Sequence, residues 1–338
     1  MTTRLQNRAV GAGRSGRRFR RAVVLGGAGF VGSHVCEALL AAGTSVLCVD
    51  NFLTGSASNV ASLAGKPGFR LVEHDATTPL NPRLLVEPVD LVLHLASPAS
   101  PVDYLRHPLQ TLRAGSYATE QGLVLARDHG ARFLLASTSE VYGDAEVHPQ
   151  PETYVGNVNP IGPRSVYDEA KRYAEALTFA YHRTYAVDVV VARIFNTYGT
   201  RMRPADGRLV PAFIGAALAG EPLTVFGDGK QTRSLCHVSD TVAGLLALAG
   251  ADTTGPVNVG NPDECSVQTL AERIIALVGS GSTIRHGPPV IDDPHRRCPD
   301  ISRANALLGW RPTVDLDNGL QDTIQWFAAH RETALVST

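Results

Sequence analysis

The stretch AVVLGGAGFVG, residues 22–32, decides the fold. The apolar run Ala22–Leu25 predicts a strand, and the glycines that follow lead directly into a helical pattern. Absent side chains allow both a tight turn and a close approach of the backbone to a pyrophosphate, which then meets the positive end of the helix. A glycine turn that only packs helix on strand is the alternative. The predicted cofactor contacts in this turn are Gly26, Gly29, Phe30, Val31 and Gly32.

A carboxylate follows at the spacing that a dinucleotide site requires. Asp50 ends the second predicted strand, 18 residues after Gly32, where it can accept hydrogen bonds from both adenosine ribose hydroxyls. It would repel a 2'-phosphate, so NAD is favoured over NADP. Asp75, after the third strand, is either a further contact or a turn residue. The other predicted contacts are Asn51, Phe52, Thr54, Gly55, Ala76, Leu95, Ala96 and Ser97.

Further apolar runs alternate with longer helical stretches along the first 200 residues. The runs are apolar on successive residues, which is typical of parallel strands covered on both faces. We therefore predict a Rossmann-like, doubly wound α/β fold. The predicted strands are Ala22–Leu25, Val46–Val49, Leu91–Leu95, Phe133–Ala136 and Val187–Ile194, and the predicted helices are His34–Ala42, Leu109–Asp128 and Tyr167–Tyr185.

Beyond Gly199 the sequence is punctuated by proline and glycine, which predicts a smaller mixed α/β C-terminal lobe over the carboxyl edge of the sheet. Pro256–Gly260 is expected to return to the sheet. The predicted organisation is a disordered basic tail at 1–20, an NAD-binding domain at 21–199 with a sheet return near 234–262, a second, substrate-binding lobe at 200–233 and 263–330, and a tail at 331–338.

Composition excludes several classes of protein. The 338 residues carry a net charge of -1, which gives no general attraction to nucleic acid or to an anionic membrane. No apolar run is long enough for a membrane span. Five widely spaced cysteines, with no C-x-x-C and no neighbouring histidine cluster, argue against disulfides and against a metal site, and favour the cytoplasm. The seven arginines in residues 1–21 indicate a solvated tail or, alternatively, an arm for an anionic partner.

Tyr167 and Lys171 form Y-x-x-x-K on a predicted helix, a spacing that places phenol and ammonium on one face. A nearby ammonium, together with a positive nicotinamide, is expected to lower the pKa of the phenol, so that it can take a proton from a sugar hydroxyl. The segment 137–143 follows the fifth strand and can bring a hydroxyl and a carboxylate to the same edge.

Five motifs then resemble one family of the extended short-chain dehydrogenase/reductase superfamily, the UDP-glucuronate decarboxylases. The resemblance runs from about Arg21 to Phe327. The motifs are STSEVYGD at 137–144, GNVNPIGPRSVYDEAKR at 156–172, ARIFNTYG at 192–199, GEPLTVFGDGKQTRS at 220–234 and DDPHRRCPDI at 292–301.

The resemblance implies that tightly bound NAD oxidises C4 of the glucuronate, that the resulting β-keto acid loses CO2, and that the 4-keto pentose is protonated at C5 and reduced by the same cofactor. Tyr167 is then the base, Lys171 tunes it and holds ribose, and Thr138 binds the reacting oxygen. Glu140 manages protons near C5. Ser139 stands where sugar 4,6-dehydratases of the superfamily have an acid, which favours decarboxylation.

The same resemblance places Arg297 at the sugar carboxylate or at the water that reprotonates C5, with Arg296 as the neighbour if the register slips. Arg233 is assigned to the nucleotide, and its planar fork suits a diphosphate. A surface ion pair is the alternative for both Arg233 and Arg297. The further predicted substrate contacts are Arg113, Tyr181, Asn196, Arg208, Thr224 and Phe226.

Two departures from the family pattern leave base recognition open. Val155 stands where the family usually has tryptophan, and residues 235–237 replace a more aromatic run. His237 is read as a packing residue rather than an acid or base, and Tyr142 and Tyr198 as packing residues too. The alternatives are dTDP-glucuronate as substrate, a nucleotide-sugar 4-epimerase or 4,6-dehydratase, and an NAD-sensing regulator without catalysis. A homodimer through Leu109–Asp128 and Tyr167–Tyr185 is a family expectation.

Overall fold

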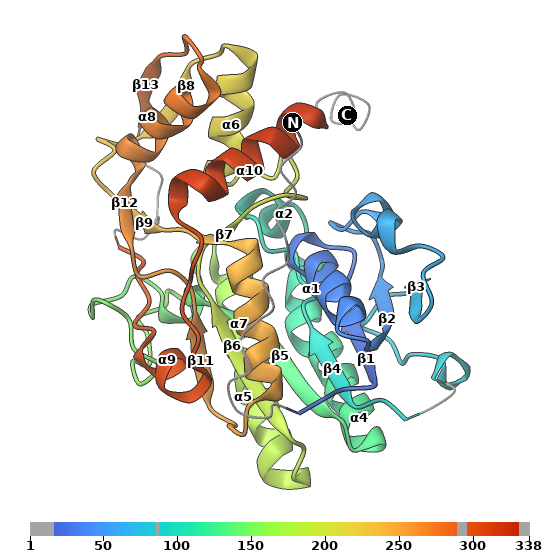
Figure 1. The fold of residues 1–338 in the computed structure, drawn as a ribbon. Helices are drawn as coiled ribbons and strands as arrows, with labels where there is room; N and C mark the ends of the chain where they lie inside the picture. Colours follow the sequence, from blue (N-terminus) through green and yellow to red (C-terminus); the bar gives the residue numbers. More distant parts are fainter. Residues whose placement is uncertain (1–16, 86–87, 289–295, 331–338) are drawn as a thin grey trace.

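A seven-stranded parallel sheet forms the centre of the protein (Figure 1). The structure is a computed structural model that describes residues 17–85, 88–288 and 296–330, so most of the two predicted tails and the start of the motif at 292–301 lie outside the described residues. The strand order β11-β6-β5-β4-β1-β2-β3 confirms the doubly wound prediction. The bounds are β1 (Arg21–Leu25), β2 (Ser45–Asp50), β3 (Phe69–Glu73), β4 (Leu91–His94), β5 (Arg132–Thr138), β6 (Val189–Ile194) and β11 (Pro256–Val259).

Helices cover both faces of the sheet, which explains why its central strands are apolar on successive residues. Val35 of α1 and Leu245 of α7 are buried on one face, and Leu123 of α4 and Ala174 of α5 on the other. None of the described helices has the length and apolar character needed to cross a membrane. The bounds are α1 (Phe30–Ala41), η1 (Ala57–Leu63), η2 (Pro82–Leu84), α2 (Pro101–Arg106), α3 (Pro108–Arg113), the π-helical turn η3 (Ala114–Ala118), α4 (Thr119–His129), η4 (Ser139–Tyr142), α5 (Ser165–Tyr185), α7 (Val238–Gly250) and α9 (Ser302–Leu308).

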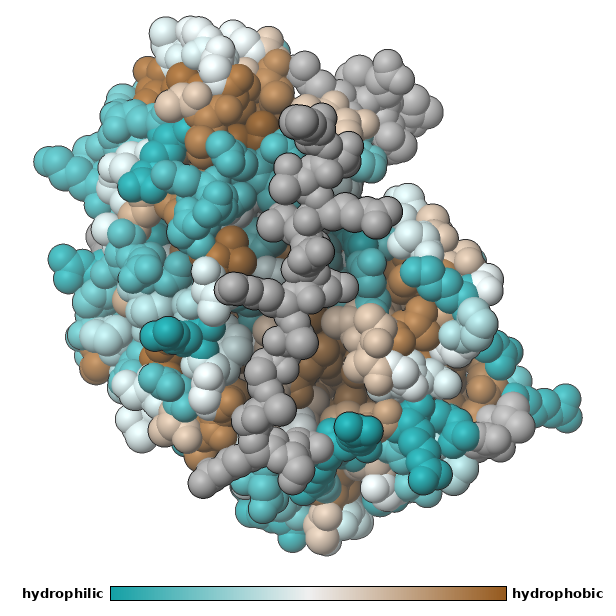
Figure 2. Space-filling view, viewed as in Figure 1, coloured by the Kyte–Doolittle hydropathy of each residue, from teal (hydrophilic) through white to brown (hydrophobic). Residues whose placement is uncertain are grey.

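A smaller lobe stands beyond the carboxyl end of the sheet (Figure 1). Its own apolar cluster includes the fully buried Ile214, Leu223, Ile274 and Leu320. On the face drawn in Figure 2, hydrophobic residues gather over this lobe. Its elements are β7 (Thr197–Tyr198), α6 (Leu209–Ala219), β8 (Leu223–Phe226), β9 (Thr232–Ser234), β10 (Cys236–His237), β12 (Glu264–Ser266), α8 (Val267–Val278), β13 (Ile284–Gly287) and α10 (Leu316–Ala329).

Two segments depart from the predicted domain boundaries. Residues 17–20, assigned to a disordered tail, are attached to the sheet domain: Arg17 forms an ion pair with Asp188, and Phe19 packs against the apolar cluster around β1. The arginine-rich composition of the tail did not indicate these two contacts. Ala304 and Trp310, assigned to the lobe, are buried in that same cluster, because α9 covers β11 and α7.

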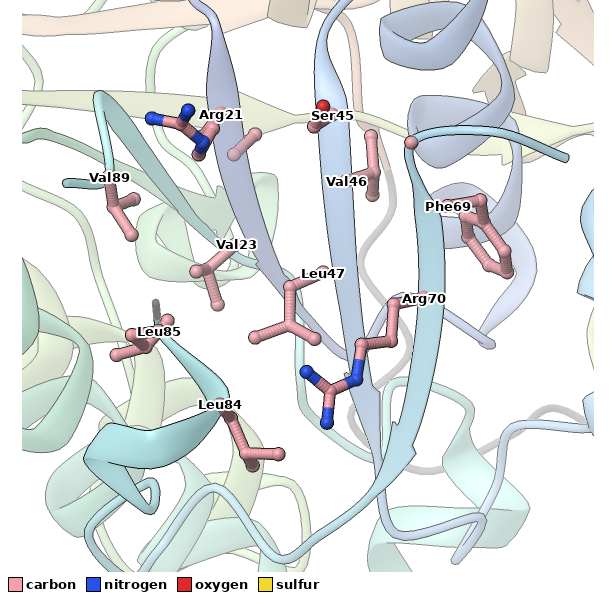
Figure 3. Close-up of a pocket in the computed structure, with 12 residues that line it drawn as sticks. Arg21, Val23, Ser45, Val46, Leu47, Phe69, Arg70, Leu84, Leu85 and Val89 are labelled. Carbon is pink, nitrogen blue, oxygen red and sulfur yellow. The ribbon is translucent and has the colours of Figure 1, made fainter. Parts of the chain in front are cut away.

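A concavity of about 370 Å³ opens on strands β1, β2 and β3 (Figure 3). Its lining includes Ala22, Ser45 and Phe69, which lie at or next to the first residues of their strands. First residues of parallel strands share the amino edge of a sheet, whereas the glycine turn and the predicted catalytic residues follow the last residues. The concavity therefore lies away from the predicted site.

The packing of η3 on α5 generates a prediction about stability. A methyl group on Gly115 would lie 2.4 Å from the carbonyl oxygen of Ala170, whereas one on Gly215 of α6 meets nothing within 4 Å among the described residues. We expect Gly115→Ala to lower the free energy of unfolding by about 1–3 kcal/mol because the helices must separate. As the matched control, Gly215→Ala should raise it by up to about 1 kcal/mol through helix propensity. Thermal unfolding of both variants measures this, and shifts of the same sign and size would contradict the contact.

Candidate active site

The turn between β1 and α1 has the shape of a phosphate cradle. Gly26 has φ +78°, and a Cβ there would lie 2.5 Å from the amide nitrogen of Ala96. A Cβ on Gly32 would lie 2.1 Å from the carbonyl oxygen of Gly26. Helix α1 begins after Gly29 without a side-chain cap, so its first amides face outward for an anion. Side chains are excluded at the positions where the sequence predicts a pyrophosphate.

Asp50 closes this cradle from the end of β2. Its two carboxylate oxygens accept hydrogen bonds from the amides of Ala28 and Phe52, each at 2.9 Å. Burial raises the pKa of Asp50, although these amide bonds oppose it. A Cβ on Gly55 would lie 2.8 Å from the carboxylate, so glycine leaves this side open. Each carboxylate oxygen can accept a further bond, and the residues present therefore fit the adenosine ribose of NAD.

The remaining predicted cofactor residues follow the ends of β2, β3 and β4. Asp75 accepts a hydrogen bond from the amide of Thr77 at 2.9 Å, so the structure shows the turn role that the sequence left open. Leu95 continues the ladder of the sheet by donating to Leu25. Cofactor contacts from these positions stay predictions.

Tyr167 lies beside the end of β5. Thr138 acts on the pKa of the Tyr167 phenol and lowers it, and the Tyr167 ring stacks on Tyr104 with centroids 5.3 Å apart and planes 9° from parallel. Lys171 lies one turn further along α5, with its ammonium 5.8 Å from the centroid of the Tyr167 ring. The ammonium donates to the carbonyl of Ala136 at 2.8 Å. The structure thus brings together the three residues to which the sequence assigned the oxidation step.

The sequence predicted that the ammonium and a bound nicotinamide together lower the pKa of Tyr167, and without the cofactor it is burial that dominates this pKa. Burial raises the pKa of Tyr167 well above its ordinary value, and Thr138 offsets only part of this. Burial also lowers the pKa of Lys171, to about 8. The ammonium keeps two further N–H donors beside the one used on Ala136, although burial disfavours its charge. Arg208 also lowers the pKa of Tyr167, and a bound nicotinamide cation would add further positive charge.

Glu140 is held between two arginines at the same edge of the sheet. Arg297 contacts Oε1 at 2.7 Å, and Arg164 contacts Oε2 at 2.6 Å. Burial alone would raise the pKa of Glu140, but the two guanidinium groups outweigh it and the pKa is lowered. Arg297 also donates to the hydroxyl of Ser139 at 3.3 Å. The site therefore contains a half-buried carboxylate between two guanidinium groups, with Asp168 beside them protonated below about pH 7, so that positive charge is left over for an anionic sugar at low pH.

Three residues of this site were not predicted from the sequence. Arg164 precedes Tyr167 by three positions, and this one-turn spacing was a usable signal. Asp168 follows Tyr167 and interacts with both Glu140 and Arg164. Tyr104 comes from α2, far away in sequence, and no spacing rule connects it to Tyr167.

Five predicted substrate residues lie on or next to β6, α6, β8 and β9. Arg208 begins α6, lies 5.6 Å over the ring of Phe30 and acts on the pKa of Tyr167, so it is near the reacting centre. Asn196 follows β6 directly. Thr224 accepts a hydrogen bond from Arg285 at 2.7 Å, and its neighbour Phe226 is 46% exposed. Arg233 lies on β9, where it donates to the carbonyl of Thr232 at 2.8 Å.

The structure contradicts the prediction that Tyr181 contacts the substrate. It lies 14 residues after Tyr167 on α5, which corresponds to about 21 Å along a helix. Its hydroxyl donates to Glu120 and its ring contacts Tyr185, at the far end of the helix. It therefore does not reach a substrate at Tyr167. Arg113 ends α3 at an exposed position, and its assignment stays a prediction.

The residues assigned to packing do pack. His237 caps α7 by accepting from the amide of Ser239, and its ring meets Tyr198 edge-on. Tyr142 is fully buried and donates to Asn258 at 2.8 Å.

Asp168 generates a prediction about pH. Burial, with Glu140 adding to it, raises the pKa of Asp168 to about 7. Because the folded protein then holds a proton that the unfolded chain releases above about pH 4, the free energy of unfolding should fall as the pH rises from about 4 to 7. We expect Asp168→Asn to remove this loss, so that its melting temperature gains on the wild type between pH 5 and pH 8. Glu169→Gln is the control; parallel pH profiles for all three proteins would contradict a protonated Asp168.

Comparison with known proteins assigns the chain to a family. The NAD dependent epimerase/dehydratase family model matches residues 22–260. UDP-glucuronic acid decarboxylase 1 of Danio rerio is 51% identical over 313 residues, covering 93% of this chain and 74% of the relative. A UDP-glucuronic acid 4-epimerase variant from Bacillus cereus, solved with UDP-4-deoxy-4-fluoro-glucuronic acid and NAD, has a TM-score of 0.81 at 28% identity, covering 91% of this chain and 99% of that chain. The chain therefore belongs to the NAD dependent epimerase/dehydratase family and, within it, to the UDP-glucuronic acid decarboxylases.

Proposed function

We propose that the protein converts UDP-glucuronate to UDP-xylose by NAD-dependent decarboxylation. The observation that carries the proposal is the half-buried Glu140, paired with Arg164 and Arg297 next to the Tyr167–Thr138 pair. A proton-transfer pair and two guanidinium groups at one edge suit a sugar acid that is oxidised at C4 and carries its carboxylate on C5. The relatives of about 50% identity that are named UDP-glucuronic acid decarboxylases support the same substrate.

In the oxidation step, Tyr167 accepts a proton. NAD, when bound, supplies the acceptor for the C4 hydride and returns that hydride at the end of the cycle. The Tyr167 oxygen takes the proton of the C4 hydroxyl, and Thr138 holds the reacting oxygen by a hydrogen bond. Burial raises the pKa of Tyr167 and the positive charge of a bound nicotinamide would oppose that rise, which couples proton transfer to cofactor binding.

The decarboxylation step uses the ketone that oxidation creates. The carboxylate is β to that ketone, so the electrons of the breaking bond move to the C4 oxygen. Protonated Tyr167 and Thr138 stabilise the enolate by donating hydrogen bonds. Arg297 and Arg164 hold the carboxylate before it leaves, since each guanidinium has donors beyond those used on Glu140. Glu140 then directs the proton that C5 receives.

Ser139 argues against elimination of water. A 4,6-dehydratase needs an acid at this position, and here a buried serine accepts a hydrogen bond from Arg297 instead. A 4-epimerase remains the second candidate because the Bacillus cereus 4-epimerase shares the fold. An epimerase leaves the mass of the sugar unchanged, so product mass separates the two activities.

The direct test is a mass balance with purified protein. We expect UDP-glucuronate to yield equal amounts of CO2 and UDP-pentose, with dTDP-glucuronate run in parallel to test the base.

Tyr167→Phe should lower turnover by at least about 100-fold while NAD still binds, because only proton transfer is lost. Arg297→Ala should lose decarboxylation but keep some C4 oxidation. An unchanged sugar mass with a new C4 epimer would contradict the proposal, as would full activity of Tyr167→Phe.

We further propose that the protein forms a homodimer through α3, η3 and α5. Leu109, Leu112, Tyr117 and Tyr173 are 39–63% exposed on these elements, an apolar surface of the kind that partner subunits cover. The elements pack against one another, so the four residues belong to one helical layer. A two-fold interface between such layers is self-complementary.

Substitutions that introduce negative charge on this surface test the dimer. We expect the wild type to sediment as a dimer and Leu109→Glu/Tyr173→Glu to sediment as a monomer, because two buried carboxylates per subunit are too costly. Leu307→Glu is the control, since Leu307 is 44% exposed on α9, away from these helices. A monomeric wild type would dismiss the proposal.

The state of the cysteine thiols bears on the cellular compartment of the protein. All five cysteines are free, and four of them are buried. Free thiols persist in a reducing compartment. We therefore propose the cytoplasm.

A further inference from the structure

Three potential metal ligands meet behind Arg297, outside the proposed reaction centre. They are His148, from the segment after η4, Glu264, the first residue of β12, and Cys298. One ligand atom from each lies within 4.8 Å of the other two. The residues are 34 or more positions apart, so no sequence motif announces them.

The geometry is close to that of a zinc site. The His148 Nε2 and Glu264 Oε2 atoms are 3.0 Å apart. In a tetrahedral site with Zn–N and Zn–O bonds of about 2.0–2.1 Å, such atoms lie about 3.3 Å apart, and a thiolate sulfur lies slightly further from each. The first pair thus needs little adjustment, and the Cys298 sulfur needs a shift of about 1 Å.

The donor set selects the metal. One imidazole, one carboxylate and one thiolate suit zinc and exclude magnesium and calcium, which require oxygen ligands. The side chains of His148 and Glu264 are 29% and 27% exposed, which gives an ion access from solvent and leaves room for water as a fourth ligand. Cys298 is 5% exposed and forms the floor.

Hydrogen bonds hold two of these ligands in place. Thr232 donates to the second carboxylate oxygen of Glu264, leaving Oε2 for a metal. The main chain of Cys298 is bonded in both directions to Gln150, with its amide donating to Gln150 Oε1 at 2.8 Å and its carbonyl accepting from the Gln150 amide at 2.9 Å. Outer contacts of this kind orient ligands in protein metal sites.

We propose that His148, Glu264 and Cys298 form a site for one zinc ion. The ion joins three segments: the loop after η4, the β9–β12 pair of the lobe, and the chain that carries Arg297. Its binding ties the lobe to the sheet domain and fixes the residue next to Arg297. This site goes beyond the proposed reaction and does not depend on it.

Cobalt(II) is the probe for the experiment, because it takes zinc sites and gives a near-ultraviolet band only when a thiolate binds it. Metal-free, reduced, full-length protein without a histidine tag is titrated with cobalt chloride. We expect one equivalent to produce the band and one equivalent of zinc to abolish it. Cys298→Ser should lose the band, and His148→Gln should weaken cobalt binding more than about tenfold.

Cys265→Ser is the matched control. Cys265 follows Glu264 directly on β12 and is half-buried, so it tests whether another thiol beside the cluster binds the metal, and its variant should keep the band. Thermal unfolding gives a second readout: zinc should raise the melting temperature of the wild type and of Cys265→Ser, but not of Cys298→Ser. Circular dichroism of each metal-free variant verifies its fold.

Either of two results overturns the proposal. One is a wild type that shows no thiolate band with cobalt. The other is a Cys298→Ser variant, folded as the wild type, that retains the band and the zinc-dependent rise in melting temperature.

Discussion

The register of α5 against β5 is the constraint on which the site depends. Tyr167, Lys171 and Glu175 follow one another at intervals of four, and all three are less than 9% exposed. Lys171 donates to the carbonyl of Ala136, and Glu175 accepts from Ser137 at 2.6 Å. Polar groups this deeply buried are costly unless bonded, so the helix cannot slide by a turn. That fixed register brings Tyr167 to Thr138 just beyond the strand.

The charges at the sheet edge build on this register. Arg164 begins the turn that leads into α5, so locking the helix also aims its guanidinium at Glu140. Arg297 reaches the same carboxylate from the C-terminal part of the chain. Glu140 therefore connects the sheet, α5 and the lobe-side segment, and loss of either arginine would leave part of its charge uncompensated.

The sequence predicted most of the fold because glycine turns and unbroken apolar runs have local causes. The meeting of parallel strand ends at one edge placed Thr138 and Glu140, and the Y-x-x-x-K spacing placed Tyr167 and Lys171 on one helix, while the roles of all four stay predictions. The sequence-based prediction failed for Tyr181, which shares a helix with Tyr167 but lies at its far end against Glu120 and Tyr185. Pairings across long separations, such as Tyr104 on Tyr167, leave no periodic signal.

In the proposed reaction, hydride leaves C4 of the sugar for NAD and returns to C4 from the same cofactor, while Tyr167 takes the proton of the C4 hydroxyl. Turnover of UDP-glucuronate carrying deuterium at C4, in ordinary water and with unlabelled NAD in solution, tests this most directly. We predict that nuclear magnetic resonance of the pentose product finds the deuterium retained at C4. Deuterium washed out to solvent, or transferred to free NAD, would contradict the account.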